Sequence, residues 1–254
     1  MKTIKKLLCV ILASSMIAFC FTACESNNAQ TSSGASEAQD NAIEFYIVRH
    51  GEQLFNTTGQ MAGWCDSPLT DEGVAQSHNL GKAFEAEGID FEAAYCSTSE
   101  RSVDTTENIL SECDKDLVAE HCKGLKELYF GEWEGQAINP FQGEDMMYRI
   151  TVGFDDVGGE TYDEVGDRAV AVMEQAVKDN GGKGGNVLIS THGMTIMSIC
   201  QKLVGDQDMF KEFQANTKSG ISNCSVTIIE YKDGNWTLKS IDDTSLRDEG
   251  ANIK

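Results

Sequence analysis

Residues 44–52 read EFYIVRHGE, an apolar run that leads directly into Arg49, His50 and Gly51. Residues 186–193 repeat this arrangement with the sequence NVLISTHG, which ends in His192 and a glycine. In an open α/β sheet, ligands bind where the carboxyl ends of the strands meet the loops that follow them. The two histidines are therefore expected to meet in one pocket, and the arginine beside the first predicts a phosphate as ligand.

Apolar, strand-like runs alternate with helical patterns along the 254 residues, which is typical of a sheet covered by helices on both faces. The sequence therefore predicts one doubly wound α/β domain with a mostly parallel central sheet. The expected strands are 43–48, 92–96, 186–190, 222–231 and 236–241, with a hairpin turn at 232–235 between the last two. The expected helices are 68–87 (with Thr70 as N-cap), 99–111, 161–178 and 194–204.

The first 23 residues are expected to be an export signal and not part of the fold. Three lysines within residues 1–6 precede an apolar stretch, 7–21, that is too short for a comfortable membrane span. Its end, Phe21-Thr22-Ala23-Cys24, resembles the lipobox of bacterial lipoproteins, in which the cysteine is lipidated, although Phe21 replaces the usual leucine. An ordinary cleaved secretory peptide and an uncleaved anchor are the alternatives.

The expected organisation is therefore a signal peptide at 1–23, a flexible tether at 24–41 with a lipid on Cys24, and a folded domain at 42–254. The tether is rich in Ser, Asn, Gln and Ala and offers nothing to pack. The expected location is extracytoplasmic, with the lipid as the contact to a bacterial membrane.

The chain is strongly acidic, with a formal net charge of -21. Removal of residues 1–23 takes away three lysines and no acids, which gives -21 - 3 = -24. Nucleic acid and anionic lipid both attract a basic surface, so neither is expected as an electrostatic partner.

Six cysteines belong to the expected domain, and they are predicted to be mostly buried free thiols, with a bridge between Cys113 and Cys122 as an alternative. Their spacing does not match that of zinc ligands. The six are Cys65, Cys96, Cys113, Cys122, Cys200 and Cys224.

The histidines are part of a longer series of motifs that resembles the histidine phosphatase superfamily, also called phosphoglycerate mutase-like. The resemblance runs from Glu44 to about Tyr231 and implies a three-layer sandwich with a short lid insertion at 131–160. Six blocks stand in family order: Val48 to Glu52 with Asn56, Gly63 to Thr70 with Gly73, Ser97 to Arg101 with Thr105, Leu125 to Gly135, Gly159 to Thr161 with Arg168, and Ser190 to Gly193.

The resemblance implies that His50 attacks a phosphomonoester and forms a phosphohistidine. It also implies that Arg49, Asn56, Arg101 and a protonated His192 bind the phosphoryl oxygens. Neither a metal nor another cofactor is expected, because Arg49 and Arg101 would repel a cation.

Glu127 matches the family's acid, which gives a proton to the leaving alkoxide. Arg168 is expected to support the fold and not to touch substrate, and the glycines after the two histidines are expected to let a ligand approach the backbone closely. The neighbours of Glu127 predict apolar surroundings that keep part of the acid protonated. These neighbours are Leu125, Leu128, Tyr129 and Phe130.

Departures from the family pattern favour one branch of it. Residues 60–63 read QMAG where many phosphatases of the family have Arg-x-Gln-Gly, so a cation is lost from the pocket rim. The lid segment carries one cation, Arg149, and Leu128 stands where mutases place arginine. The expected activity is hydrolysis of small phosphomonoesters; a cofactor-dependent phosphoglycerate mutase and a non-catalytic phosphoester-binding lipoprotein are the alternatives. The alcohol part of the substrate and the oligomeric state stay open.

Overall fold

A computed structural model describes residues 41–138, 153–217 and 220–253. The expected signal peptide, most of the tether, Cys24 and Arg149 of the lid lie outside the described residues.

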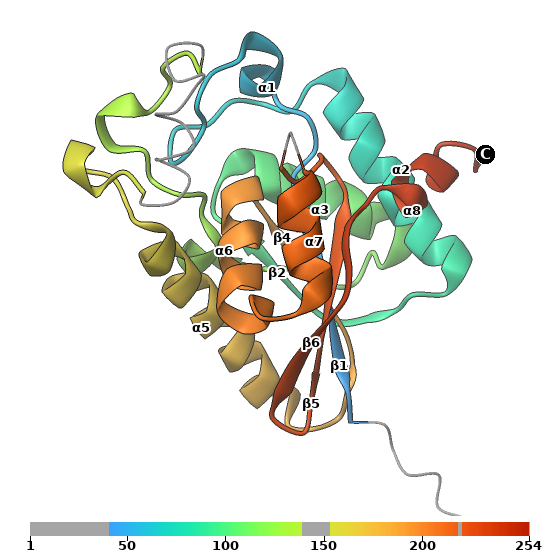
Figure 1. The fold of residues 1–254 in the computed structure, drawn as a ribbon. Helices are drawn as coiled ribbons and strands as arrows, with labels where there is room; N and C mark the ends of the chain where they lie inside the picture. The colour runs from blue at the N-terminus through green and yellow to red at the C-terminus, as the bar shows by residue number, and fades with distance from the viewer. Residues whose placement is uncertain (1–40, 139–152, 218–219, 254) are drawn as a thin grey trace, which may run out of the picture. The chain divides into compact units, whose positions relative to one another are not determined.

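A six-stranded sheet with the order β3-β2-β4-β1-β5-β6 forms the centre of the domain (Figure 1). β1 pairs parallel with β4, in a register that runs from Ile43 opposite Gly185 to Arg49 opposite Thr191, and β2 is parallel to both β4 and β3. β5 and β6 are an antiparallel hairpin at one edge. The predicted mostly parallel sheet is confirmed. The strands are β1 Ile43–Arg49, β2 Phe91–Ser97, β3 Glu120–Cys122, β4 Gly185–Thr191, β5 Val226–Lys232 and β6 Asn235–Asp243.

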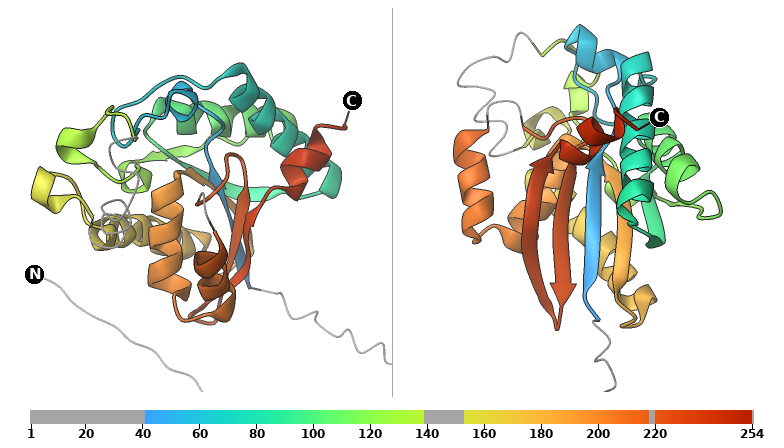
Figure 2. Two further views of the ribbon diagram at one scale, coloured as in Figure 1. Left: turned by 45° about the horizontal axis from the view of Figure 1, so that its top comes forward. Right: turned by 90° about the vertical axis from the view of Figure 1, so that its right-hand side faces the viewer.

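Helices cover both faces of this sheet, so the three-layer sandwich is confirmed (Figure 2). Side chains of β1 alternate between the faces, as the pleat requires: Phe45 and Ile47 belong to the core under α5 and α6, and Tyr46 and Val48 to the core under α2 and α3. One layer contains α2 Asp71–Glu87, α3 Glu100–Cys113 and α8 Ser245–Gly250; the other contains α5 Tyr162–Asn180, α6 Gly193–Val204 and α7 Asp208–Asn216.

Two local features predicted from the sequence, the N-cap at Thr70 and the hairpin turn at 232–235, are confirmed. The hydroxyl of Thr70 accepts a hydrogen bond from the Gly73 N–H at 3.1 Å, which is the predicted N-cap of α2. At the hairpin, Asp233 and Gly234 have φ of 51° and 82°, the two positive values that a type I′ turn needs.

Elsewhere the structure differs from the sequence prediction. β5 begins at Val226 and not at residue 222, because Cys224 has a φ of 48° and its N–H donates to Arg49 O at 2.9 Å. Several short elements were not predicted, since a run of three to nine residues carries little periodicity. They are β3, α1 Leu54–Thr58, α7, α8 and the 3₁₀ turns η1 Lys123–Leu125, η2 Gly131–Trp133 and η4 Asp155–Val157.

The six cysteines of the domain are free thiols. Cys96, Cys200 and Cys224 are buried, whereas the other three are partly exposed, so the expected burial holds for half of them. Within the described ranges, none of the helices has the length and apolar character needed to cross a bilayer.

Candidate active site

The two histidines that follow strands lie next to each other. His50 follows β1 and His192 follows the parallel neighbour β4, and their ring centroids are 5.3 Å apart. Both are buried, with exposed fractions of 3% and 0%. The expected convergence of the two rings at the carboxyl edge of the sheet is confirmed, but only His50 lines the cavity found there.

His50 is held by a hydrogen bond from Nδ1 to the backbone oxygen of Gly51 at 2.7 Å. Because a carbonyl can only accept, Nδ1 carries the proton and Nε2 carries the lone pair. Burial, and next the cations of Arg101 and Arg49, lower the pKa of His50 well below its usual value. The ring is therefore neutral near pH 7, the form in which Nε2 is a nucleophile.

His192 places Nε2 2.9 Å from Ser97 Oγ, at the end of β2, while its buried Nδ1 has no hydrogen-bond partner. Its pKa is also lowered well below the usual value, first by burial and then by Arg101 and His50. His192 is therefore neutral in these surroundings, which do not favour the protonated form considered from the sequence.

Arg49 and Asn56 line the same cavity as His50. Arg49 Nη1 donates to the backbone oxygen of Ile221 at 2.5 Å, and its buried Nε has no partner. Asn56 is fixed by the first turn of α1, where its Oδ1 accepts from Gln53 N at 3.1 Å. These two predicted phosphate ligands thus stand beside the histidine, with Arg49 Nε as an available donor.

Arg101 is fully buried and is held differently from the sequence expectation. Its Nη1 donates to Cys65 O and forms an ion pair with Asp66 at 2.7 Å, and its Nη2 donates to Ala62 O and Gly63 O. Both terminal nitrogens are therefore occupied by the 62–66 loop, and Nε is the donor without a partner. Arg101 lies close enough to both histidines to lower their pKa values, although it does not line the cavity.

Asp66 is a residue that sequence reasoning missed. Besides pairing with Arg101, its Oδ2 accepts from Glu100 N at 2.6 Å at the start of α3. The available signal was an acid in the loop block just before Ser67-Pro68, but its partner is 35 positions away, so spacing did not reveal it.

Glu127 is buried, with 6% of its surface exposed, and lies at the amino end of α6. Its Oε1 accepts from Leu128 N at 2.9 Å and from Thr195 N and Oγ1 at 3.1 Å each, and its Oε2 accepts from Met194 N at 3.2 Å. The carboxyl is therefore not in the apolar company expected from its sequence neighbours, because it accepts hydrogen bonds from backbone amides and from the Thr195 hydroxyl at the positive end of a helix.

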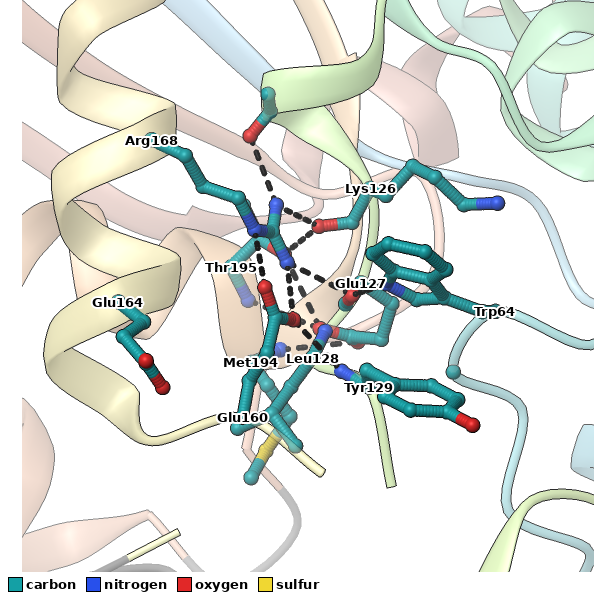
Figure 3. Close-up of polar contacts among 12 residues, drawn as sticks. Trp64, Lys126, Glu127, Leu128, Tyr129, Glu160, Glu164, Arg168, Met194 and Thr195 are labelled. Carbon is teal, nitrogen blue, oxygen red and sulfur yellow. Dashed lines mark hydrogen bonds and ion pairs between the residues drawn. The ribbon is translucent and has the colours of Figure 1, made fainter. Parts of the chain in front are cut away.

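The backbone of Glu127 is clamped by residues from two distant segments (Figure 3). Arg168 of α5 donates to Gly124 O at 2.8 Å, to Lys126 O at 2.5 Å and to Glu127 O at 2.9 Å. Trp64 Nε1 donates to the same Glu127 O at 3.0 Å. This is the supporting position that the sequence predicted for Arg168, and it is directed at the candidate acid.

Glu160 completes this clamp. It forms an ion pair with Arg168 at 2.9 Å, and its Oε2 accepts from Tyr129 N at 2.9 Å (Figure 3). The planar guanidinium is thereby fixed between a carboxylate and three carbonyl oxygens, an arrangement that suits the rigid fork of arginine and not the single ammonium of lysine.

Gly51 has a different role from the one expected. A Cβ at this position would lie 2.5 Å from Gly73 O, so glycine is needed for the close packing of the loop after β1 against the start of α2. At Gly193, by contrast, an added Cβ would meet its nearest neighbour, Arg49, at 3.7 Å.

Four of the candidate residues, Arg49, His50, Asn56 and Glu127, line a cavity of about 280 Å³, whereas Arg101 and His192 lie behind its lining. Gln53 and Gln60 add uncharged polar side chains to this lining. In the part of the chain that the structure describes, no group of three or more His, Cys, Asp or Glu side chains is arranged to hold a metal ion.

Similar proteins are found by sequence. A sequence model described as histidine phosphatase superfamily (branch 1) matches residues 45–244. A metal-independent phosphoserine phosphatase of Arabidopsis thaliana is 27% identical over 219 residues, which cover 82% of this chain and 85% of that protein. A probable phosphoglycerate mutase GpmB of Yersinia pestis (strain Pestoides F) is also 27% identical over 219 residues, covering 82% and 97%.

Solved structures show the same architecture. A phosphoglycerate mutase from Bacillus anthracis str. Sterne superposes with a TM-score of 0.71 and 28% identity, over 84% of this chain and 98% of that one. Bacillus stearothermophilus YhfR superposes with a TM-score of 0.68 and 28% identity, over 81% and 99%. The named relatives thus divide between phosphatases and mutases.

Proposed function

Because the chain belongs to the histidine phosphatase superfamily (branch 1) and is an enzyme of phosphatase or mutase type, we propose that it hydrolyses phosphomonoesters through a phosphohistidine on His50. The observation that carries this proposal is the neutral His50 ring, whose Nδ1 is held by Gly51 O and whose Nε2 is left for attack. The cavity that it lines also contains Arg49 and Glu127.

In the first step, Nε2 of His50 forms a bond to phosphorus and the bond from phosphorus to the alcohol oxygen breaks. Arg49 and Asn56 in the cavity lining, together with the unpartnered Nε of Arg101, are the donors proposed to stabilise the negative phosphoryl oxygens. A phosphoryl dianion in the pocket also favours a proton on His192, whose Nδ1 has no protein partner.

Glu127 serves both proton transfers. Oε1 accepts three hydrogen bonds, whereas Oε2 accepts one, so Oε2 is the oxygen with room for a proton. In the first step, this proton goes to the leaving alkoxide; in the second, the carboxylate takes a proton from the water that attacks phosphorus, and His50 is released.

Water as the acceptor is favoured over a second substrate hydroxyl by the position after Glu127. A mutase of the phosphoglycerate type must hold a second anionic group, but Leu128 is fully buried in a hydrophobic cluster with Phe130 and Val165 and presents no cation.

The test is an assay of residues 42–254 with p-nitrophenyl phosphate and with 3-phosphoglycerate, without added metal. The variant His50→Ala is assayed in parallel as the control. Phosphate release that His50→Ala abolishes supports the hydrolase. Isomerisation of 3-phosphoglycerate without phosphate release would favour the mutase. Ligand binding without labelled phosphate on His50 would favour a binding protein.

Attachment to a bacterial membrane outside the cytoplasm belongs to the same proposal and is supported by residues 1–24: lysines, an apolar stretch, and a lipobox-like end at Cys24. Labelling of the full chain with a radioactive fatty acid tests it. Incorporation that Cys24→Ala abolishes supports a lipid anchor, and equal incorporation in both chains rules out Cys24 as the lipidated residue.

A further inference from the structure

The cavity at His50 is lined by more apolar than polar side chains. Its apolar wall is formed by Met61, Phe130, Phe154, Met194, Met197 and Ile221. Among the described residues that line the cavity, the charged side chains are Arg49 and Glu127, and the uncharged polar ones include Gln53, Asn56 and Gln60.

The apolar wall is a fixed part of the fold. Phe130 and Phe154 pack edge to face with ring centroids 4.9 Å apart, and Phe154 also packs edge to face on Trp133 at 5.6 Å. Met61, Phe130 and Phe154 are exposed by only 4%, 7% and 1%, and they belong to one hydrophobic cluster. Met194 and Met197 add longer, more adaptable side chains from α6.

This wall discriminates between alcohols. A carboxylate placed against these methionines and phenylalanines would lose its hydration, and their side chains cannot donate a hydrogen bond to it, which costs on the order of several kcal/mol for a charged group. An apolar alcohol instead gains about 25 cal/mol for each Å² of apolar surface that it buries.

We infer that the alcohol half of the substrate is an uncharged, apolar group, such as one aromatic ring or a short alkyl chain. The cavity of about 280 Å³ is slightly smaller than most small-molecule sites, which have volumes of roughly 300–1,000 Å³. This inference rests on the proposed hydrolysis at His50 and sets the chain apart from relatives that are named for phosphoserine or phosphoglycerate.

The experiment compares primary alkyl phosphates, so that the leaving groups have similar basicity. We expect kcat/KM for 2-phenylethyl phosphate to exceed that for O-phosphoserine and for 3-phosphoglycerate by about tenfold or more, the discrimination typical of a pocket that cannot pair a polar group. Equal values, or a preference for either carboxylated ester, would overturn the inference and leave the proposed hydrolysis intact. Absence of hydrolysis with all three esters and with p-nitrophenyl phosphate would overturn the proposed function itself.

A cation placed on the wall gives a second, independent measurement. Met197→Lys on α6 introduces an ammonium next to the cavity, and the lysine stem can follow the apolar surface. The preference for 2-phenylethyl phosphate over O-phosphoserine should fall by about tenfold. The matched control is Met209→Lys on α7, where the methionine is 43% exposed and does not line the cavity, so the net charge changes equally and the preference should stay. Equal preferences in the two variants would show that the wall does not select the alcohol.

Discussion

His50 shows how burial and neighbouring cations prepare one side chain for its chemistry. The ring would be unreactive if protonated, and the fold avoids this by placing it beside Arg49 and Arg101 and away from water. The same placement makes the stability of the domain depend on pH, because the unfolded chain has no such constraint.

The free energy of unfolding should therefore decrease as the pH is lowered below about 6.5, the usual pKa of histidine. The pKa of His50 in the folded state lies well below the unfolded value of about 6.5. Below pH of about 6.5 the unfolded state binds more protons than the folded state, so the free energy of unfolding decreases, by at most ~1.4 kcal/mol per pH unit for this residue.

His50→Asn should remove this contribution. Urea unfolding at pH 7.5, 6.5 and 5.5 should show a smaller loss of stability in His50→Asn than in the wild-type domain. His121→Asn, at an exposed histidine, is the matched control and should keep the wild-type slope. A His50→Asn slope equal to that of wild type would contradict the buried, neutral histidine.

Replacement of Glu127 should slow the reaction only for esters whose leaving group needs a proton. Glu127→Gln keeps an oxygen for the hydrogen bonds from Leu128 and Thr195 but has no proton to give. Transfer of phosphate from an alkyl ester to His50 should slow by about 10²–10⁴-fold, whereas p-nitrophenyl phosphate, whose leaving group needs no proton, should still give a burst of p-nitrophenolate.

Rapid-quench measurement of the first turnover separates these two substrates. Glu132→Gln, an exposed glutamate five residues further on, is the control and should behave as wild type. Normal alkyl ester turnover in Glu127→Gln would show that another group supplies the proton.

A clamp formed by Arg168 of α5, Glu160 and Trp64 holds the segment around Glu127. Arg168 and Glu160 contact backbone atoms from Gly124 to Tyr129 and do not line the cavity. They are positioning residues, because they act on the reaction through the location of Glu127.

Arg168→Lys should lower kcat without a comparable change in KM. Lysine keeps the charge for Glu160 but cannot reach three carbonyl oxygens at once, so the Glu127 carboxyl shifts, and a small displacement of a catalytic group costs on the order of 10²-fold. Steady-state kinetics with 2-phenylethyl phosphate would measure this split. Lys202→Arg on α6, where the lysine pairs with Asp163 and Asp167 of α5, should leave both constants unchanged. Equal losses in the two variants, matched by equal losses of thermal stability, would reduce Arg168 to a structural role.

The elements that the sequence predicted are those with long, clear patterns. The apolar runs at β1 and β4 and the long amphipathic helices α2, α3 and α5 were found to within two or three residues, because burial imposes their periodicity. The pairing of Arg101 with Asp66, and the contact of Glu127 with the amino end of α6, were not predictable. Both join segments that only the folded sheet brings together.

At the scale of the whole domain, charge opposes the binding of an anionic substrate. Residues 42–254 contain 20 - 3 = 17 basic and 41 - 3 = 38 acidic residues, a net charge of 17 - 38 = -21. The cations near His50 are buried and local, so a phosphate dianion approaches against a long-range repulsion that salt screens.

We therefore expect kcat/KM to rise with ionic strength, by about twofold or more between 20 and 200 mM sodium chloride, while kcat stays constant. The range corresponds to a Debye length that shortens from roughly 20 Å to about 7 Å. Assays with p-nitrophenyl phosphate at fixed pH would measure it. A steady decrease of kcat/KM with salt would indicate that the local cations dominate the approach.

The direction of β1 has a practical consequence. The chain enters this strand at Ile43, and the strand delivers Arg49 and then His50 at its other end, seven residues away, a separation of roughly 20 Å. An affinity tag, a fusion partner or a solid support joined ahead of Ile43 would therefore connect to the end of the strand remote from the catalytic cavity. Attachment at the start of β1 accordingly immobilises this enzyme by the strand end that is farthest from His50.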